Sequence, residues 1–81
     1  MQSLPPYERI KWGCRRGMLE LDLILEPYVL TRYPTASPKE QELFVRFLNE
    51  ADQDLFDWLL KKKTPASAEF NKMIKVLLQH D

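Results

Sequence analysis

Apolar residues recur at three- and four-residue intervals along most of this chain, which is the spacing of an amphipathic helix. No stretch sustains the strict alternation of apolar and polar residues that a half-buried strand shows. Apart from Pro27, the prolines and the two glycines fall at the ends of the periodic segments or between them, as they do where short turns join helices. The pattern predicts an all-α fold, a compact bundle of five short helices that forms a single domain over residues 1–81.

The first two predicted helices cover about residues 5–12 and 18–32. The first begins at two prolines, which are tolerated where the backbone N–H has no helical partner, and Gly13 follows its end. In the second, Pro27 removes a hydrogen bond at a cost of roughly 3 kcal/mol, so a kink or a break near Leu23 is expected. Its predicted apolar face comprises Leu19, Leu23 and Leu30, widened by Leu21, Ile24, Leu25 and Tyr28.

Three further helices have recognisable starts. Ser37 and Glu40 stand in the register of a capping box, with a proline at the first helical position between them. Asp52 is the expected cap of a fourth helix, and the Thr64-Pro65 pair is expected to begin a fifth. The predicted core of these helices comprises Leu43, Phe44, Phe47, Leu48, Leu55, Phe56, Leu59, Leu60, Phe70, Met73, Ile74, Leu77 and Leu78.

The composition of the chain argues against several classes of protein. The chain has 81 residues, with 12 basic and 12 acidic side chains and a formal net charge of zero. Both signs are interspersed, which argues against the basic surface of a nucleic-acid binder. No apolar run approaches the roughly 18 residues of a membrane span, so no membrane insertion is expected. A single cysteine, Cys14, excludes an intramolecular disulfide and suits a reducing cytoplasm or organelle matrix, of which we expect the cytoplasm. With only His80 beside it, a zinc site would lack ligands.

Catalytic machinery is missing from the sequence. It contains no glycine-rich phosphate loop and no nucleophile elbow, so we expect a protein that is not an enzyme and has no catalytic residues. Cys14 precedes Arg15 and Arg16, whose charge would favour a thiolate. The favoured interpretation of Cys14 is nevertheless a small buried apolar side chain.

The segment 12–22 concentrates unusual choices of residue. If Arg16 and Glu20 share a helix, they are neighbours four positions apart, and an exposed ion pair worth about 0.3–0.5 kcal/mol is the simplest interpretation. The basic residue comes first, however, which is the poorer order. Gly17 would cost up to about 1 kcal/mol within a helix, so it indicates either a special backbone angle or a surface that another chain approaches closely. Structural and functional interpretations remain equally open.

A second cluster lies at residues 54–60, where acidic and aromatic side chains alternate. Phe56 and Trp58 are two positions apart, so they point to different sides of one short helix. Core packing is favoured for Phe56. For Trp58, core packing and a role as an exposed anchor for a partner protein are equally open.

These residues resemble a known family, the bacterial SdhE proteins and their mitochondrial counterparts. The resemblance begins with Arg9-Ile10 and Trp12 and continues through the segments Cys14-Arg15-Arg16-Gly17-Met18 and Glu20-Leu21-Asp22. It resumes in the Asp54-Leu55-Phe56 and Trp58-Leu59 block. Its central motif is R-G-x-x-E, formed here by Arg16, Gly17 and Glu20.

The resemblance implies a five-helix FAD assembly factor, a flavinylation chaperone. Such a protein binds the flavoprotein subunit of succinate dehydrogenase, and in bacteria also that of fumarate reductase, and promotes covalent attachment of FAD to that subunit. It implies that Arg16 and Glu20 face the flavoprotein, that Gly17 allows close approach, and that Trp12, Arg9 and Arg15 flank the same surface. A supporting role is implied for Asp22, while stable binding of FAD by the monomeric chain itself is not expected.

Two other functions remain to be weighed. One is an antitoxin-like regulator that binds another protein or DNA, although the even charge balance weighs against DNA. The other is an enzyme that transfers FAD with Glu20 or Cys14 as acid or base. In that case removal of Arg16 or Glu20 would abolish the chemistry and leave the complex intact.

Overall fold

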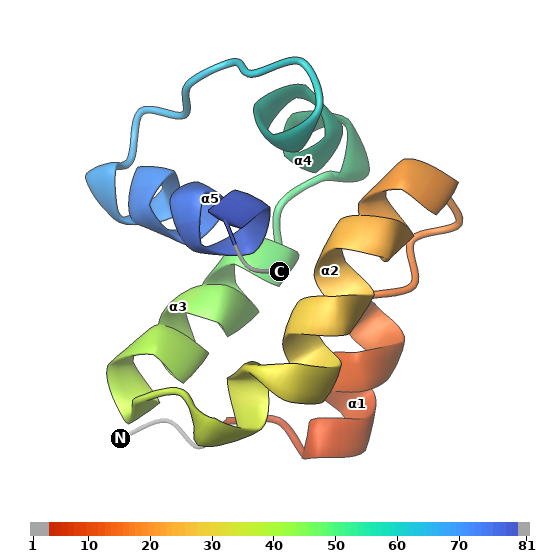
Figure 1. Ribbon diagram of the computed structural model, residues 1–81, viewed down its shortest axis with the longest axis vertical. Helices are drawn as coiled ribbons and strands as arrows, with labels where there is room; N and C mark the ends of the chain where they lie inside the picture. The colour runs from red at the N-terminus through yellow and green to blue at the C-terminus, as the bar shows by residue number, and fades with distance from the viewer. Residues whose placement is uncertain (1–3, 80–81) are drawn as a thin grey trace.

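The computed structural model describes residues 4–79, and every regular element in that range is helical. The elements are α1 (Tyr7–Gly13), α2 (Leu19–Thr31), a short 3-10 turn η1 (Tyr33–Thr35), α3 (Pro38–Leu48), α4 (Asp52–Leu59) and α5 (Ala68–Gln79), as Figure 1 shows. The predicted all-α fold with five α-helices is therefore confirmed for the described part of the chain.

Helix α2 is the element around which the others are arranged. It packs beside α1 on one side and contacts α4 and α5 on the other, while α3 packs against α5 (Figure 1). The core that these contacts enclose is apolar, and none of its fully buried members carries a charge. The buried residues are Ile10, Cys14, Leu21, Leu25, Tyr28, Val29, Tyr33, Phe44, Phe47, Leu48, Leu55, Leu59, Met73 and Leu77.

Two aromatic groups hold α3 in place. On one side, the Phe44 ring lies 4.6 Å from that of Tyr28 and 5.6 Å from that of Tyr33, measured between ring centroids. On the other, Phe47 meets Phe70 edge-on at 5.3 Å and the Trp58 ring at 5.7 Å. Aromatic pairs at these separations add to the free energy of simple burial, so α3 is tied both to α2 and to the α4–α5 pair.

The apolar face predicted for α2 is wrong in part. Leu21, Leu25 and Tyr28 are buried as expected, but Leu19, Leu23 and Leu30 are exposed on the opposite side of the helix. The helix is apolar almost all round, so spacing alone does not choose which side packs inward. The structure buries the side that carries the tyrosine, and within residues 4–79 the three outer leucines are each more than half exposed.

The expected break at Pro27 does not occur, and α2 continues through the proline to Thr31. Beyond the proline, the Thr31 hydroxyl donates to the Pro27 carbonyl at 2.7 Å and the Arg32 N–H donates to the Tyr28 carbonyl at 2.9 Å. Each large apolar side chain that α2 buries contributes about 1.5–3 kcal/mol, and several of them together outweigh the cost of one proline.

Two of the three predicted helix starts need correction. The Ser37 hydroxyl accepts from the Glu40 N–H at 3.2 Å, which confirms the cap of α3. Asp52 is the first residue of α4 and not its cap, because its carboxylate bonds to another part of the chain instead. Helix α5 begins at Ala68 instead of the Thr64-Pro65 pair, since the Ser67 hydroxyl accepts from the Phe70 N–H and caps it there.

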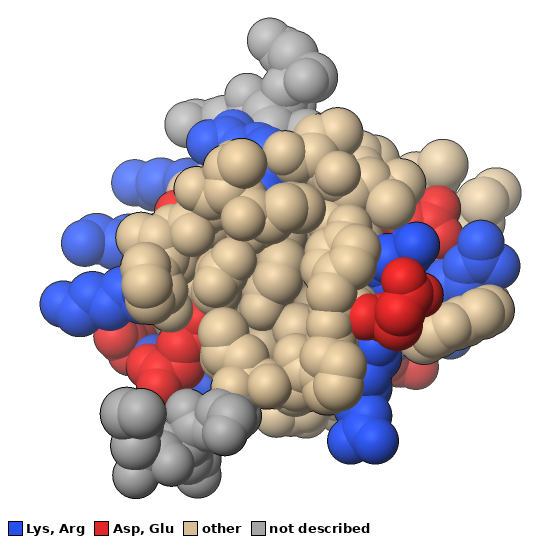
Figure 2. All heavy atoms as spheres, turned by 90° about the horizontal axis from the view of Figure 1, so that it is seen from below, with Lys and Arg blue, Asp and Glu red and all other residues tan. Residues whose placement is uncertain are grey.

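Charged side chains of both signs lie around the edges of the face shown in Figure 2, and the middle of that face is uncharged. The ion pairs are mostly exposed, such as Arg46 with Glu69 at 3.0 Å. Exposed pairs of this kind are worth only about 0–1 kcal/mol. The fold is therefore held by its apolar core, and one less exposed ion pair, described below, lies at the candidate site.

Candidate protein-binding site

The candidate residues surround the corner where α1 turns into α2. The turn begins with two hydrogen bonds back to α1, from the Cys14 N–H to the Lys11 carbonyl at 3.1 Å and from the Arg15 N–H to the Trp12 carbonyl at 3.0 Å. It ends where the Asp22 carboxylate accepts from the Arg16 N–H at 2.8 Å. Asp22 thus has the supporting role expected of it, because it holds the corner against the first turn of α2.

Gly17 lies at the exposed tip of this corner with φ at +79°. In that left-handed region a side chain brings Cβ too close to the backbone, which costs roughly 1–2 kcal/mol for most residues. A Cβ atom placed on Gly17 would meet no other atom within 4 Å. The backbone angle accounts for the glycine within this chain, and the open space leaves its backbone accessible to another molecule.

Arg16 bonds to its own chain. Its guanidinium donates to the Leu48 carbonyl at the end of α3 and to the Asp52 carboxylate at 3.2 Å, and its side chain is only 19% exposed. The positive charge therefore lies at the C-terminus of α3, where the helix dipole favours it. Its Nε is buried without a hydrogen bond in the described chain. Arg16 ties the corner to the α3–α4 junction, while its predicted contact with a partner stays a prediction.

Glu20 lies in the first turn of α2 and is exposed. Because α2 begins at Leu19, Arg16 and Glu20 do not share a helix, and the intrahelical ion pair considered for them is wrong. Within residues 4–79, the Glu20 carboxylate forms no hydrogen bond or ion pair with another side chain. It is free to accept hydrogen bonds from a partner.

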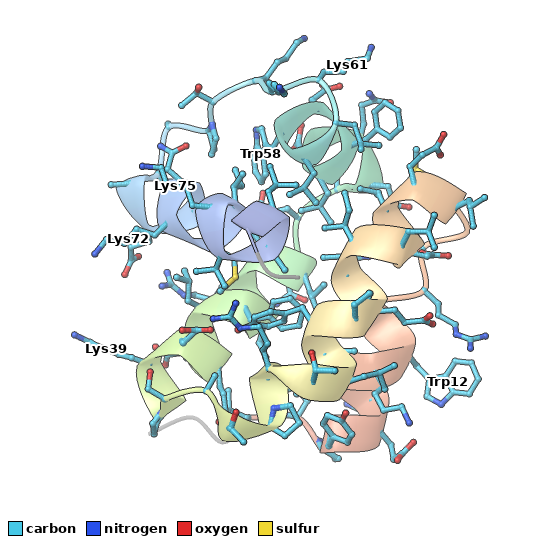
Figure 3. All side chains as sticks on the ribbon, in the orientation of Figure 1. Trp12, Lys39, Trp58, Lys61, Lys72 and Lys75 are labelled. Carbon is cyan, nitrogen blue, oxygen red and sulfur yellow. The ribbon has the colours of Figure 1, made fainter. Side chains whose placement is uncertain are left out.

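Trp12 and Arg15 line one hollow beside the corner, and Arg9 lines another. Trp12 and Arg15 line a shallow hollow between α1 and α2, and the Arg15 guanidinium lies 5.3 Å from the centre of the Trp12 ring. Arg9 lines a different hollow, together with Arg16, between α1 and the end of α3. Trp12 projects outward from α1 (Figure 3), and it is 66% exposed. The six candidates thus surround the corner on two sides.

Cys14 is fully buried beneath the corner, as its favoured interpretation expected. Burial raises the pKa of its thiol to about 12, since a thiolate would lose its hydration, and the nearby Arg16 charge offsets this only in part. Cys14 is therefore a neutral core side chain at physiological pH, and neither a reactive thiol nor an acid or base.

We expect Cys14 to resist thiol reagents in the folded chain. Labelling with iodoacetamide should stay slow between about pH 7 and about pH 9, because the buried thiol remains protonated throughout that range. Mass spectrometry should show complete labelling only after unfolding in urea. Rapid labelling at about pH 7 with the circular dichroism spectrum intact would instead indicate an exposed thiolate.

The second cluster packs within the chain. Trp58 lies beside Phe47 and Phe70, with its ring centroid 5.8 Å from that of Phe70, so the core interpretation of Trp58 is the correct one. Phe56 is half-buried at the edge of the core, with the Lys61 ammonium 6.0 Å from its ring. Neither aromatic is an exposed anchor.

The described part of the chain contains no cluster of side chains suited to a metal ion. Across residues 4–79, no three His, Cys, Asp or Glu side chains come together as a metal site requires, and His80 lies outside the described residues. The hollow beside Trp12 measures about 240 Å³, and a larger one of about 400 Å³ lies beside Trp58, away from the corner. None of the described helices could span a membrane.

Within residues 4–79, the corner combines an accessible glycine backbone, an unpaired carboxylate and a projecting tryptophan, which makes it a candidate surface for contact with another protein. Comparison with known proteins agrees. Residues 8–81 match the family described as flavinator of succinate dehydrogenase, and the chain belongs to that family. The family is one of assembly factors and not of enzymes, so a role as an enzyme that transfers FAD is set aside.

Curated relatives extend this match over most of the chain. An FAD assembly factor SdhE from Coxiella burnetii is 43% identical over 72 residues, covering 89% of this chain and 88% of its own. The SdhE of Pseudomonas putida is 40% identical over 70 residues, covering 86% and 83%. That of Photorhabdus laumondii is 44% identical over 69 residues, covering 85% and 78%.

Proposed function

We propose that this chain is a flavinylation chaperone that binds the flavoprotein subunit of succinate dehydrogenase through its α1–α2 corner and promotes covalent attachment of FAD. The observation that carries the proposal is the exposed Gly17 turn beside the unpaired carboxylate of Glu20. Both belong to a chain whose family is described as flavinator of succinate dehydrogenase. No feature of the site favours a regulator that binds DNA.

The residues of the corner have different proposed roles because they are buried to different extents. Gly17 lets the backbone of the flavoprotein approach, and Glu20 accepts charged hydrogen bonds from it. Arg16 holds both in position, because its guanidinium anchors the corner to the end of α3. The free energy of binding then favours the arrangement of the flavoprotein in which the flavin and the residue that it modifies meet.

Other parts of the proposal concern partners and location. We expect the same surface to serve the flavoprotein of fumarate reductase, and we expect the chain to act as a monomer in the cytoplasm of a bacterium. A buried, protonated cysteine suits that reducing compartment. Stable binding of FAD by the chain alone is not expected, since the hollows found among the described residues are open to solvent and not enclosed.

Substituting Glu20 tests the proposed contact without disturbing the fold. Glu20→Ala should weaken binding to the apo flavoprotein by about tenfold, equivalent to about 1.4 kcal/mol, because one charged hydrogen-bond acceptor is lost. The free energy of unfolding should change by less than about 0.5 kcal/mol, since Glu20 is exposed. Binding is measured by isothermal titration calorimetry and stability by urea unfolding.

Glu42→Ala is the matched control, because Glu42 is an exposed acid on α3 and its removal makes the same change in net charge. It should bind as the wild type does. If Glu20→Ala binds like Glu42→Ala, Glu20 is not a contact. A loss of more than about 2 kcal/mol of stability would instead make Glu20 structural.

A further inference from the structure

The outer face of α2 exposes large apolar side chains. Leu19, Leu23 and Leu30 are 68%, 64% and 52% exposed, and Trp12 of the neighbouring α1 is 66% exposed. Leu19 and Leu23 are one turn apart, and Leu30 lies two turns further along the same side of the helix, with the half-buried Glu26 between Leu23 and Leu30. These four side chains are called the leucine stripe below.

The fold does not explain the leucine stripe. Helix α2 already buries Leu21, Leu25 and Val29 completely on its inner side, so its attachment to the bundle needs none of the outer leucines. Apolar side chains that are scattered singly over a surface need no explanation, but a contiguous group marks an interaction site. The leucine stripe therefore requires a partner surface outside the described chain.

The surroundings of the stripe resemble the anatomy of a binding interface. Trp12 and Leu30 line the hollow between α1 and α2, whose floor includes Val29. At its edge, the Arg15 guanidinium donates to the Glu26 carboxylate at 3.0 Å. An apolar centre with a charged rim, containing tryptophan and arginine, is the composition of the surfaces that dominate binding energies.

The leucine stripe lies next to the residues that are proposed to contact the flavoprotein. Glu20 follows Leu19 directly, and Leu23 lies one turn further along α2, so a protein that contacts Gly17 and Glu20 necessarily reaches the first two leucines. The stripe is thus continuous with the surface proposed above for the flavoprotein.

The charged side chains around the leucine stripe argue against a second copy of this chain as its partner. The rim carries three carboxylates and two basic groups, from Glu8, Glu20, Glu26, Lys11 and Arg15. Glu26 pairs with Arg15 and Glu8 with Lys11, so two stripes placed face to face would bring together the two remaining Glu20 carboxylates, which is unfavourable. The unpaired Glu20 carboxylate calls instead for a basic group on a different protein.

We propose that the leucine stripe is the apolar part of the interface with the flavoprotein subunit, whose matching surface presents an apolar side chain to the hollow beside Trp12 and a basic group to Glu20. This inference rests on the proposed function. It extends the interface from the Gly17 corner along the outer face of α2, over residues that the R-G-x-x-E motif does not include.

The test compares two leucines of the stripe with one outside it. Leu19→Glu and Leu23→Glu should each lower affinity for the apo flavoprotein subunit at least tenfold, as measured by calorimetry. Leu78→Glu is the matched control, since Leu78 is 46% exposed but lies on α5 outside the stripe. All three variants should keep the wild-type circular dichroism spectrum and urea midpoint, and Leu23→Met should retain binding.

The outcomes separate the inference from the function on which it rests. If Leu19→Glu and Leu23→Glu bind as tightly as Leu78→Glu while Gly17→Arg does not bind, the leucine stripe is outside the interface and the proposed function stands. If the wild-type chain fails to bind, both fail. If gel filtration shows a wild-type dimer that Leu23→Glu dissociates without weakening flavoprotein binding, a second copy covers the stripe and the inference is overturned.

Discussion

Gly17→Arg abolishes flavoprotein binding and flavinylation while the helical circular dichroism spectrum persists: this is the largest functional effect that we expect. The new side chain enters space that is empty in the free chain, because no atom lies within 4 Å of where its Cβ would be. In the proposed complex the backbone of the flavoprotein would occupy this space, and the arginine would displace it. The left-handed backbone angle adds a cost of roughly 1–2 kcal/mol in stability.

Gly17→Ala separates the cost of the backbone angle from the clash of a long side chain with the partner. It carries the same strain at φ +79° but adds only a methyl group, so it should lose similar stability and retain most of the binding. Calorimetric titration against the apo flavoprotein, with urea unfolding of each variant, measures both quantities. Gly17 would have only a structural role, through its backbone angle, if Gly17→Arg were unfolded. The same would follow if the two variants lost equal amounts of binding free energy.

Arg16→Ala has the largest effect on stability of the substitutions considered. It removes the donors to the Leu48 carbonyl and the Asp52 carboxylate, and it leaves that carbonyl at the C-terminal end of α3 without its partner. The expected loss is about 1–3 kcal/mol. For a domain of this size, thermal unfolding should then occur about 4–20 °C lower.

Arg46→Ala provides the comparison, because Arg46 also pairs with a carboxylate but both side chains of that pair are at least half exposed. It should cost less than about 1 kcal/mol. Differential scanning calorimetry of both variants measures the contrast. Equal melting temperatures for Arg16→Ala and the wild type would show that the Arg16 bonds do not stabilise the corner.

A helix boundary could be predicted from the sequence where the capping residues have no competing contact with a distant part of the chain. Ser37 with Glu40 defines the start of α3 because both the cap and its recipient N–H lie within four residues. The same reasoning failed at Asp52, whose carboxylate is engaged by Arg16 from 36 residues away. It also failed at the Thr64-Pro65 pair, where Pro65 is buried and the later Ser67 supplies the cap.

The candidate site was predictable as a segment but not as a geometry. The unfavourable positions of Arg16 and Gly17 marked the corner, and the structure explains them by a hydrogen-bonded anchor and a left-handed backbone angle. That Arg16 points inward while Glu20 points outward depends on how the corner meets α3, which no local pattern encodes. The exposure of Leu19 and Leu23 depends likewise on which side of an evenly apolar helix finds a partner.

The central claim is that this chain promotes flavin attachment through its α1–α2 corner. The most direct measurement is in-gel FAD fluorescence of the denatured flavoprotein subunit after co-expression with the wild-type chain, with Gly17→Arg, or with neither. We predict strong covalent flavin fluorescence with the wild type alone. Fluorescence that is the same in all three cases, with no co-purification of the two proteins, would contradict the account.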